Sequence, residues 1–246
     1  MQFTKSLILL AALTTGTLAH PTGVERRQSD WTSTPSSGSY STSGFGSSTA
    51  SSGTGVTYAG NVGNPYGSNI IEVSASDANQ YKYVAQFTGS NTDPWTVAIF
   101  NKIGSDGKMD GWFGQACHTF TLAAGESKYI AFDDDSQGGW AAASGSTIPT
   151  DNAGGYASTW GEFDFGSTTN NGWSGFDVSA IAAQNAGLSV SGMKICDAIS
   201  STCSSITPDA GVVNNAYTAA QTDVGGIGGN IASGPVRLAV TLGYSG

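Results

Sequence analysis

Charged side chains are scarce in this sequence, and basic ones are the scarcest. Only 11% of the 246 residues are charged, and 9 Lys and Arg residues stand against 18 Asp and Glu residues, whereas roughly a quarter of an average protein is charged. The net charge of −9 repels phosphate backbones and anionic membranes, so we expect neither nucleic acid nor a membrane as a partner. Low charge together with 35 glycines also disfavours coiled coils and helical bundles.

Side chains that carry common catalytic chemistry are few as well. The sequence has two histidines, and His20 lies in a segment expected to be removed. His118 is then the one histidine left, which argues against a zinc enzyme. His118 follows Cys117, but adjacent residues of a strand face opposite sides of a sheet, so we expect an ordinary surface histidine. The sequence has no Gly-x-Ser-x-Gly elbow, phosphate loop or dinucleotide motif. We therefore predict no cofactor, no metal and no assigned catalytic residue.

The first 19 residues have the pattern of a secretory signal peptide. Lys5 precedes an apolar run from Leu7 to Leu13, and residues 17–19 have the small-x-small pattern of a cleavage site. No run elsewhere reaches about 18 apolar residues, so no transmembrane helix is expected. We therefore expect a secreted protein that is extracellular or associated with the cell wall.

Composition divides the rest of the chain into three parts. Residues 20–27 end in Arg26-Arg27, which is either the processing site of a propeptide or plain surface charge. Between residues 32 and 57, 21 of 26 residues are Ser, Thr or Gly, too little apolar surface to offset the entropy of ordering. We expect residues 28–57 to be a disordered, Ser/Thr/Gly-rich segment and residues 58–246 to be the folded domain.

The folded domain has the pattern of an all-β protein. Short runs that alternate with period two, or are mostly apolar, are separated by turn residues, and they cover residues 81–88, 95–100, 128–132, 188–196 and 236–244. Helical periodicity is nearly absent, with short helical turns expected only at residues 179–186 and 214–222. Regularly spaced strands with turns between them predict a single-domain β-sandwich or barrel.

The cysteines fit an oxidising compartment. Cys196 and Cys203 are seven residues apart, so we expect a disulfide that stabilises the fold by ~2 kcal/mol. Cys117 is then left over, as either a buried, inert residue or a free thiol. The acidic run Asp133–Asp135 is either a set of Ca²⁺ ligands or a solvated turn, and it lacks the spacing of a calcium loop.

Acidic and aromatic residues occur together in two neighbouring segments, residues 159–165 and 172–179. On a strand, Glu162 and Asp164 share one face, and the phenylalanines between and after them pack on the other. Asp177 follows a second aromatic cluster and is expected to lie opposite them.

Glu162, Asp164, Asp177, Trp160 and Trp173 are the candidate ligand-binding residues. Carboxylates accept hydrogen bonds from sugar hydroxyls, and indole rings offer apolar faces to sugar C–H groups, so the set suits a neutral carbohydrate. Two carboxyl groups about 5–10 Å apart, one with a raised pKa, are also the minimum for glycoside hydrolysis. The remaining alternative is an acidic surface with no specific role.

Longer segments add a family resemblance. Residues 60–73 read GNVGNPYGSNIIEV and residues 93–97 read DPWTV. Together with the segments around Trp160 and Trp173, they resemble the fungal secreted proteins typified by the Aspergillus allergen number four, over the chain from about Trp31 to its end. The resemblance implies a secreted fungal protein, bound by IgE in some species, with no established enzymatic activity.

The resemblance also bears on the cysteines. Cys196 and Cys203 match the short loop of that family. Members of the family carry further cysteines where this chain has Ser41 and Ser158. A disulfide between the N-terminal segment and the core is therefore not expected here.

A weaker likeness is to thaumatin-like sandwiches. Glu162-Phe163 and the segment Phe176–Ser179 match positions that line an acidic cleft associated with β-1,3-glucan in that fold. The many disulfides of thaumatin-like proteins are absent from this sequence.

Three functions follow as alternatives. The leading hypothesis is a non-enzymatic secreted protein that binds cell-wall polysaccharide through the face that carries Glu162, Asp164 and Asp177. The second is a weak endo-β-1,3-glucanase with Glu162 as acid and Asp177 as base or nucleophile. The third is a host-interacting or structural surface protein with no glycan ligand.

Overall fold

The computed structural model describes residues 30–89 and 92–246. The predicted signal peptide, residues 1–19, and the candidate propeptide, residues 20–27, lie outside the described residues. Among those that are described, no helix has the length and apolar character needed to cross a membrane.

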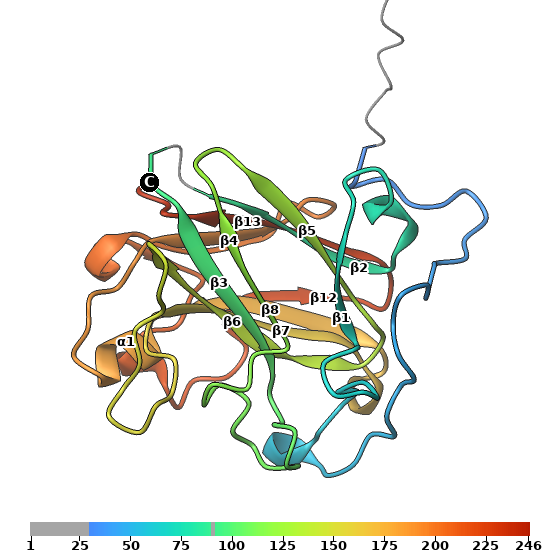
Figure 1. Cartoon of the computed structure of the whole chain (residues 1–246), viewed down its shortest axis with the longest axis horizontal. Helices are drawn as coiled ribbons and strands as arrows, with labels where there is room; N and C mark the ends of the chain where they lie inside the picture. Colours follow the sequence, from blue (N-terminus) through green and yellow to red (C-terminus); the bar gives the residue numbers. More distant parts are fainter. Residues whose placement is uncertain (1–29, 90–91) are drawn as a thin grey trace, which may run out of the picture.

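Two β-sheets stacked face to face form the protein (Figure 1). The first has seven strands in the order β1 (Ile70–Val73), β5 (Ser127–Phe132), β2 (Tyr83–Thr88), β13 (Val236–Leu242), β9 (Met193–Asp197), β10 (Cys203–Ile206) and β11 (Val213–Asn214). The second has six strands in the order β12 (Gly229–Ile231), β8 (Trp173–Ser179), β7 (Thr159–Ser167), β6 (Ser136–Ser144), β3 (Trp95–Asn101) and β4 (His118–Leu122). The predicted all-β sandwich is confirmed.

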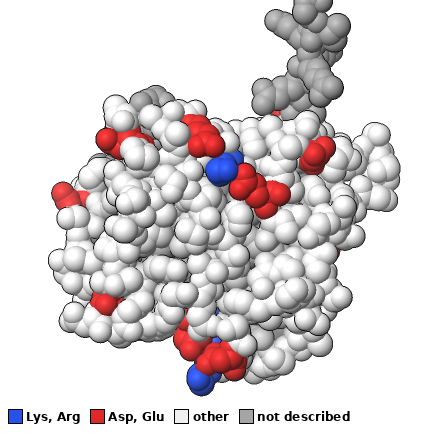
Figure 2. All heavy atoms as spheres, in the orientation of Figure 1, with Lys and Arg blue, Asp and Glu red and all other residues white. Residues whose placement is uncertain are grey.

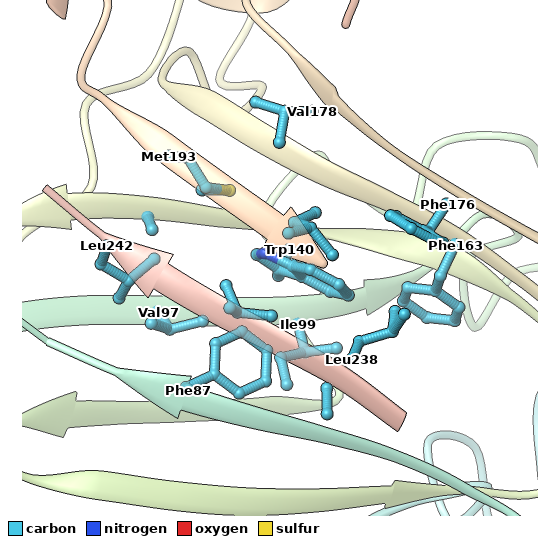
Figure 3. Packing of buried hydrophobic residues seen from close by; sticks show 14 of the residues in the cluster. Phe87, Val97, Ile99, Trp140, Phe163, Phe176, Val178, Met193, Leu238 and Leu242 are labelled. Carbon is cyan, nitrogen blue, oxygen red and sulfur yellow. The ribbon is translucent and has the colours of Figure 1, made fainter. Parts of the chain in front are cut away.

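The core lies between the sheets and fixes the orientation of each strand. Figure 3 shows inward side chains from both sheets meeting around Trp140, which is fully buried. Its ring lies edge-on to Phe87, with centroids 5.1 Å apart, and stacks on Phe163 at 5.7 Å. Full burial of one such side chain contributes roughly 1.5–3 kcal/mol. Because the inner faces of β6 and β7 are held in this way, their alternate residues must face outward.

Most of the strands agree with the sequence pattern. The predicted runs at residues 236–244 and 81–88 contain β13 and β2, and those at residues 95–100 and 128–132 match β3 and β5 to within one residue, whereas the run at residues 188–196 becomes a strand only from Met193. The helical turns are present as α1 (Ile181–Asn185) and as a 3-10 turn at Ala219–Gln221. Strand β6 is not predicted, because its sequence SQGGWAAAS has neither clear alternation nor β-branched residues.

The segment at residues 30–57, which we call the N-terminal strap, has little regular structure, but it lies against the sandwich (Figure 1). Ser47 forms an antiparallel bridge with Asn64, and the Ser48 hydroxyl donates to Asp133 Oδ2 at 2.7 Å. The Trp31 ring lies 5.9 Å from the Tyr129 ring, centroid to centroid. Within the segment 28–57 that is predicted to be disordered, hydroxyls and rings of residues 30–57 thus find partners on the domain.

The cysteines divide as expected. Cys196 and Cys203 occupy paired positions of β9 and β10 and form a disulfide. Cys117 is a free, half-buried thiol beside Gly67 and Tyr66. Burial raises the pKa of the Cys117 thiol, which keeps it in the less reactive protonated form.

Candidate functional site

The outward face of β7 and β8 brings the predicted acidic residues together. Along β7, Trp160, Glu162 and Asp164 face outward, and the residues between them are buried. In the antiparallel pairing of the two strands, Glu162 lies directly opposite Asp177. The predicted arrangement of the three carboxylates on one face is confirmed.

Glycines form the floor of a groove beside these carboxylates. Glu162 pairs with Gly139 on its β6 side, and Asp164 pairs with Gly175 on its β8 side. A Cβ atom at Gly175 would meet only the Gly229 carbonyl oxygen, at 3.8 Å. Because glycine has no side chain, these positions leave room for a groove of about 500 Å³, which is the size of a small-ligand site.

Aromatic rings form one wall of the groove. Trp160 donates its indole N–H to the Tyr156 carbonyl at 3.1 Å and lies edge-on to Phe100, with centroids 5.0 Å apart. Trp112, from the loop between β3 and β4, lies 6.1 Å from Trp160. Because the Trp160 N–H already donates to the protein backbone, a ligand meets only the apolar surface of the ring.

The opposite wall is the glycine loop, residues 225–229. Gly228 donates its backbone N–H to Asn215 Oδ1 at 2.9 Å, which holds the loop in place. A Cβ atom at Gly228 would lie 2.3 Å from the Phe176 carbonyl oxygen and 2.7 Å from Asp177 Cβ. Only glycine permits this close approach, and it brings backbone directly over the Asp177 side chain.

Burial changes the titration of the facing pair Glu162 and Asp177. Loss of solvent raises the pKa of Glu162, and a hydrogen bond from Ser179 opposes this effect. Loss of solvent also raises the pKa of Asp177 well above its ordinary value, and the neighbouring Glu162 raises it further. Two adjacent carboxyl groups that resist ionisation together keep a proton to a higher pH than isolated ones, and a protonated carboxyl group donates as well as accepts hydrogen bonds.

Asp164 continues the acidic row. Burial raises its pKa to about 6, and a hydrogen bond from Gln137 opposes the rise. Gln137 also accepts a hydrogen bond from Lys102 Nζ at 2.8 Å. Burial lowers the pKa of Lys102, and Asp164 acts against that effect. The groove therefore offers both donors and acceptors.

Two carboxylate oxygens in this groove lack protein partners. Asp164 Oδ1 and Asp177 Oδ1 are both buried, and neither accepts a hydrogen bond from the described residues. A buried polar atom without a partner costs about 1–3 kcal/mol. Both residues line the groove, but the two oxygens have almost no exposed surface, so a ligand hydroxyl group reaches them only when the carboxyl group turns toward the groove.

The predicted set differs from the observed lining in one member. Glu162, Asp164, Asp177 and Trp160 line the groove, but Trp173 does not. Trp173 lies at the start of β8 and is 42% exposed. It shares the face of Asp177 but is four residues away, roughly 14 Å along the strand.

Several lining residues were not predicted: Lys102, Met109, Trp112, Gln137, Ile227 and Asn230. Most of them come from loops or strand ends, where strand periodicity gives no signal. The run GGIGG at residues 225–229 was the available signal, because clustered glycines mark a close approach of backbone.

The acidic run Asp133–Asp135 is also not the solvated turn that was expected. Asp133 accepts hydrogen bonds from Ser48 and Asn61, while Asp135 accepts one from Tyr58 at 2.6 Å, and both aspartates are buried. Asp134 is exposed and pairs with Lys82 at 2.6 Å. No group of three or more metal-ligating side chains suited to a metal ion occurs within residues 30–89 and 92–246.

Charge elsewhere on the visible surface is sparse. Figure 2 shows a mostly uncharged face with more acidic than basic groups. His118 lies half-buried, 3.4 Å from Glu72, rather than simply on the surface.

Fold and groove define a class: a two-sheet β-sandwich with an acidic, aromatic-walled groove on the outer face of one sheet. Residues 68–242 match the model of the Allergen Asp f 4-like domain family, and the chain belongs to this family. It is 57% identical to the Allergen Asp f 4 of Aspergillus fumigatus over 215 residues, which cover 87% of this chain and 67% of the relative.

Among solved structures, the chain is similar to the crystal structure of the protein elicitor MoHrip2 from Magnaporthe oryzae. That match has a TM-score of 0.41 and 14% identity, and it covers 66% of this chain and 99% of the other.

Proposed function

We propose that this chain is an exported protein of the extracellular space or cell wall that binds neutral polysaccharide, in particular β-glucan, in the outer groove. The signal-like first 19 residues support export. The groove supports binding without a cofactor, because its lining supplies carboxyl, amide and aromatic groups. By analogy with the allergen named among its relatives, the protein is also a candidate for recognition by IgE.

One observation carries the proposal: Asp164 Oδ1 and Asp177 Oδ1 are buried without protein partners beside an aromatic wall. Once the carboxyl groups turn toward the groove, sugar hydroxyls donate hydrogen bonds to such oxygens, and the apolar faces of sugar rings pack on indole rings. A phosphorylated or carboxylated ligand fits poorly, because three acidic groups face one amine, that of Lys102.

Retention of the full chain on insoluble β-glucan and on chitin tests the proposal. Two variants separate chemistry from shape: Glu162→Gln with Asp177→Asn alters the carboxyl pair, and Gly175→Val fills the floor, where a Cβ atom meets nothing closer than 3.8 Å. We expect binding to fall about tenfold or more in both. Asp209→Asn removes an exposed carboxylate outside the groove and serves as the matched control.

The outcome that would contradict the proposal is equally specific. Absence of retention on both polymers, or retention unchanged by both groove variants, removes carbohydrate binding as the function of this site. A protein that fails to bind glycan but binds a host protein supports the third alternative, a host-interacting surface protein.

A hydrolytic function, a weak endo-β-1,3-glucanase, is a second candidate that rests on the same pair. Directly opposite residues of antiparallel strands have Cβ atoms roughly 5 Å apart, close to the carboxyl spacing of retaining glycosidases. The raised pKa of Asp177 and of Glu162 lets one carboxyl group supply a proton. Release of reducing sugar during the binding assay, abolished by either single carboxyl variant, favours hydrolysis over binding alone.

A further inference from the structure

A second cavity adjoins the groove. It has a volume of about 370 Å³ and lies between the start of β7 and helix α1. Trp112, Trp160 and Glu162 line both cavities. The three shared side chains place the two hollows next to each other on one face of the molecule.

The strand register gives the direction of this surface. The pairs Asp164–Gly175, Glu162–Asp177 and Trp160–Ser179 follow one another along β7 and β8. The first two pairs line the groove, and Glu162, Trp160 and Ser179 line the second cavity. From Asp164 to Trp160 the strand covers roughly 14 Å, which exceeds the length of a single sugar ring.

Polar groups recur along this line with aromatic rings between them. Asp164 and the Glu162–Asp177 pair line the groove, and Asp151 and Asn185 line the second cavity. Trp112 and Trp160 stand between the two sets, with ring centroids 6.1 Å apart. Such repetition matches a ligand in which rings and hydroxyl groups also repeat, and it exceeds what one monosaccharide needs.

We infer that the two cavities form one extended cleft that binds several consecutive sugars of a linear, neutral glycan, passing over Trp112 and Trp160, rather than a single sugar. This inference rests on the proposed function and specifies its substrate class. The groove with the unpartnered aspartate oxygens binds the first sugars, and the second cavity adds contacts that only a longer chain reaches.

The test compares ligand lengths by calorimetric titration of the full chain with the β-1,3-linked glucose disaccharide and hexasaccharide. We expect the hexasaccharide to bind at least about tenfold more tightly. This gain exceeds the few-fold statistical advantage of a ligand with several equivalent binding positions.

Substitutions in the second cavity test whether this cavity provides the higher affinity for the hexasaccharide. Ala182 is half-buried on α1 and lines the second cavity but not the groove, so Ala182→Phe fills the second cavity and leaves Asp164 and Asp177 in place. We expect this variant to keep disaccharide binding and to lose the preference for the longer chain, and Asn185→Ala to lose part of it. Gly175→Val weakens both ligands. Ala124→Phe, in the exposed turn between β4 and β5, adds the same ring elsewhere and leaves both affinities unchanged.

Two results would overturn the inference, and they differ in what they imply. Equal affinity for both lengths, or a length preference that survives both Ala182→Phe and Asn185→Ala, leaves glycan binding in place but rejects the extended cleft. Absence of binding to either oligosaccharide and to the insoluble polymers rejects the extended cleft and the proposed function together. An unchanged unfolding midpoint for each variant shows that the comparison is made on folded protein.

Discussion

Asp164, Glu162 and Asp177 are costly to bury as carboxylates, and they share a face with little countercharge. Burial raises the pKa of all three, for Asp164 to about 6. A folded state that raises the pKa of an acid holds a proton that the unfolded chain releases. These residues therefore destabilise the fold at neutral pH. Such destabilisation is expected at a binding site, where a ligand supplies hydrogen bonds to the buried carboxyl groups.

The sign of this effect gives a prediction for Asp164. Between about pH 4, near the pKa of an unfolded aspartate, and pH 6 the folded chain binds the extra proton, so stability falls as the pH rises through this window. Asp164→Asn removes the titration. We expect it to stabilise the fold by on the order of 1 kcal/mol at pH 8, after allowance for solvent screening, and not at pH 4.

Urea unfolding from pH 4 to pH 8 measures this difference. Asp177→Asn should shift stability in the same direction, since burial raises the pKa of Asp177 as well. Asp209→Asn, at an exposed position, should leave the pH profile as it is. A profile for Asp164→Asn parallel to that of the unaltered chain would contradict the prediction.

At the scale of elements, the alternation of buried and exposed residues made β7 and β8 predictable, whereas of the groove walls only Trp160 was predicted. Residues of β7 alternate between the core and the outer face, so the shared face of Glu162 and Asp164 followed from the sequence. Strand β6, which supplies Gly139, lacks that pattern. The loop that carries Trp112 reaches the groove through long-range packing against Trp160, which local sequence does not encode.

The glycine loop provides a prediction at this scale. Gly228 has φ of +107°, and an added Cβ atom would lie 2.3 Å from the Phe176 carbonyl oxygen. Gly228→Ala must therefore displace the loop, at a cost of roughly 1–3 kcal/mol. We expect lower stability by urea unfolding, a more exposed Asp177 and weaker retention on β-glucan.

Gly225 offers the matched control in the same loop. A Cβ atom at Gly225 meets nothing within 4 Å, and its backbone is not in the left-handed region. Gly225→Ala should therefore be neutral or slightly stabilising. Equal effects of the two substitutions would show that close approach at Gly228 does not set the position of the loop.

At the scale of the whole molecule, the N-terminal strap belongs to the folded unit. Arg237 on β13 is fully buried and donates to backbone carbonyl groups on both sides of this boundary: Trp31 at 3.0 Å in the strap, and Lys82 and Tyr81 at 2.8 Å in the domain. Composition pointed to a loose segment because Ser, Thr and Gly bury little apolar surface. Composition does not reveal that a distant arginine and buried aspartates form hydrogen bonds with this segment.

Shortening the chain to residues 58–246 tests this view of the molecule. The deletion removes two acceptors of Arg237, the carbonyl groups of Trp31 and Ser33, and uncovers Tyr81, whose ring packs against Phe45 with centroids 5.6 Å apart. Lost packing and lost hydrogen bonds to a buried charge together predict a destabilisation of roughly 3 kcal/mol or more. Urea unfolding of residues 30–246 and of residues 58–246 measures the difference directly.

A point substitution separates anchoring from chain length. Trp31→Ala in the longer chain removes the ring that packs on Tyr129 and should produce part of the loss, while Val56→Ala, at a side chain that is 77% exposed, should produce none. Equal stability of the two chain lengths would place the boundary of the folded unit at residue 58, and the contacts of Arg237 with the strap would then contribute nothing measurable. A large loss instead means that the sandwich is complete only with the strap in place, because a buried guanidinium needs all of its acceptors.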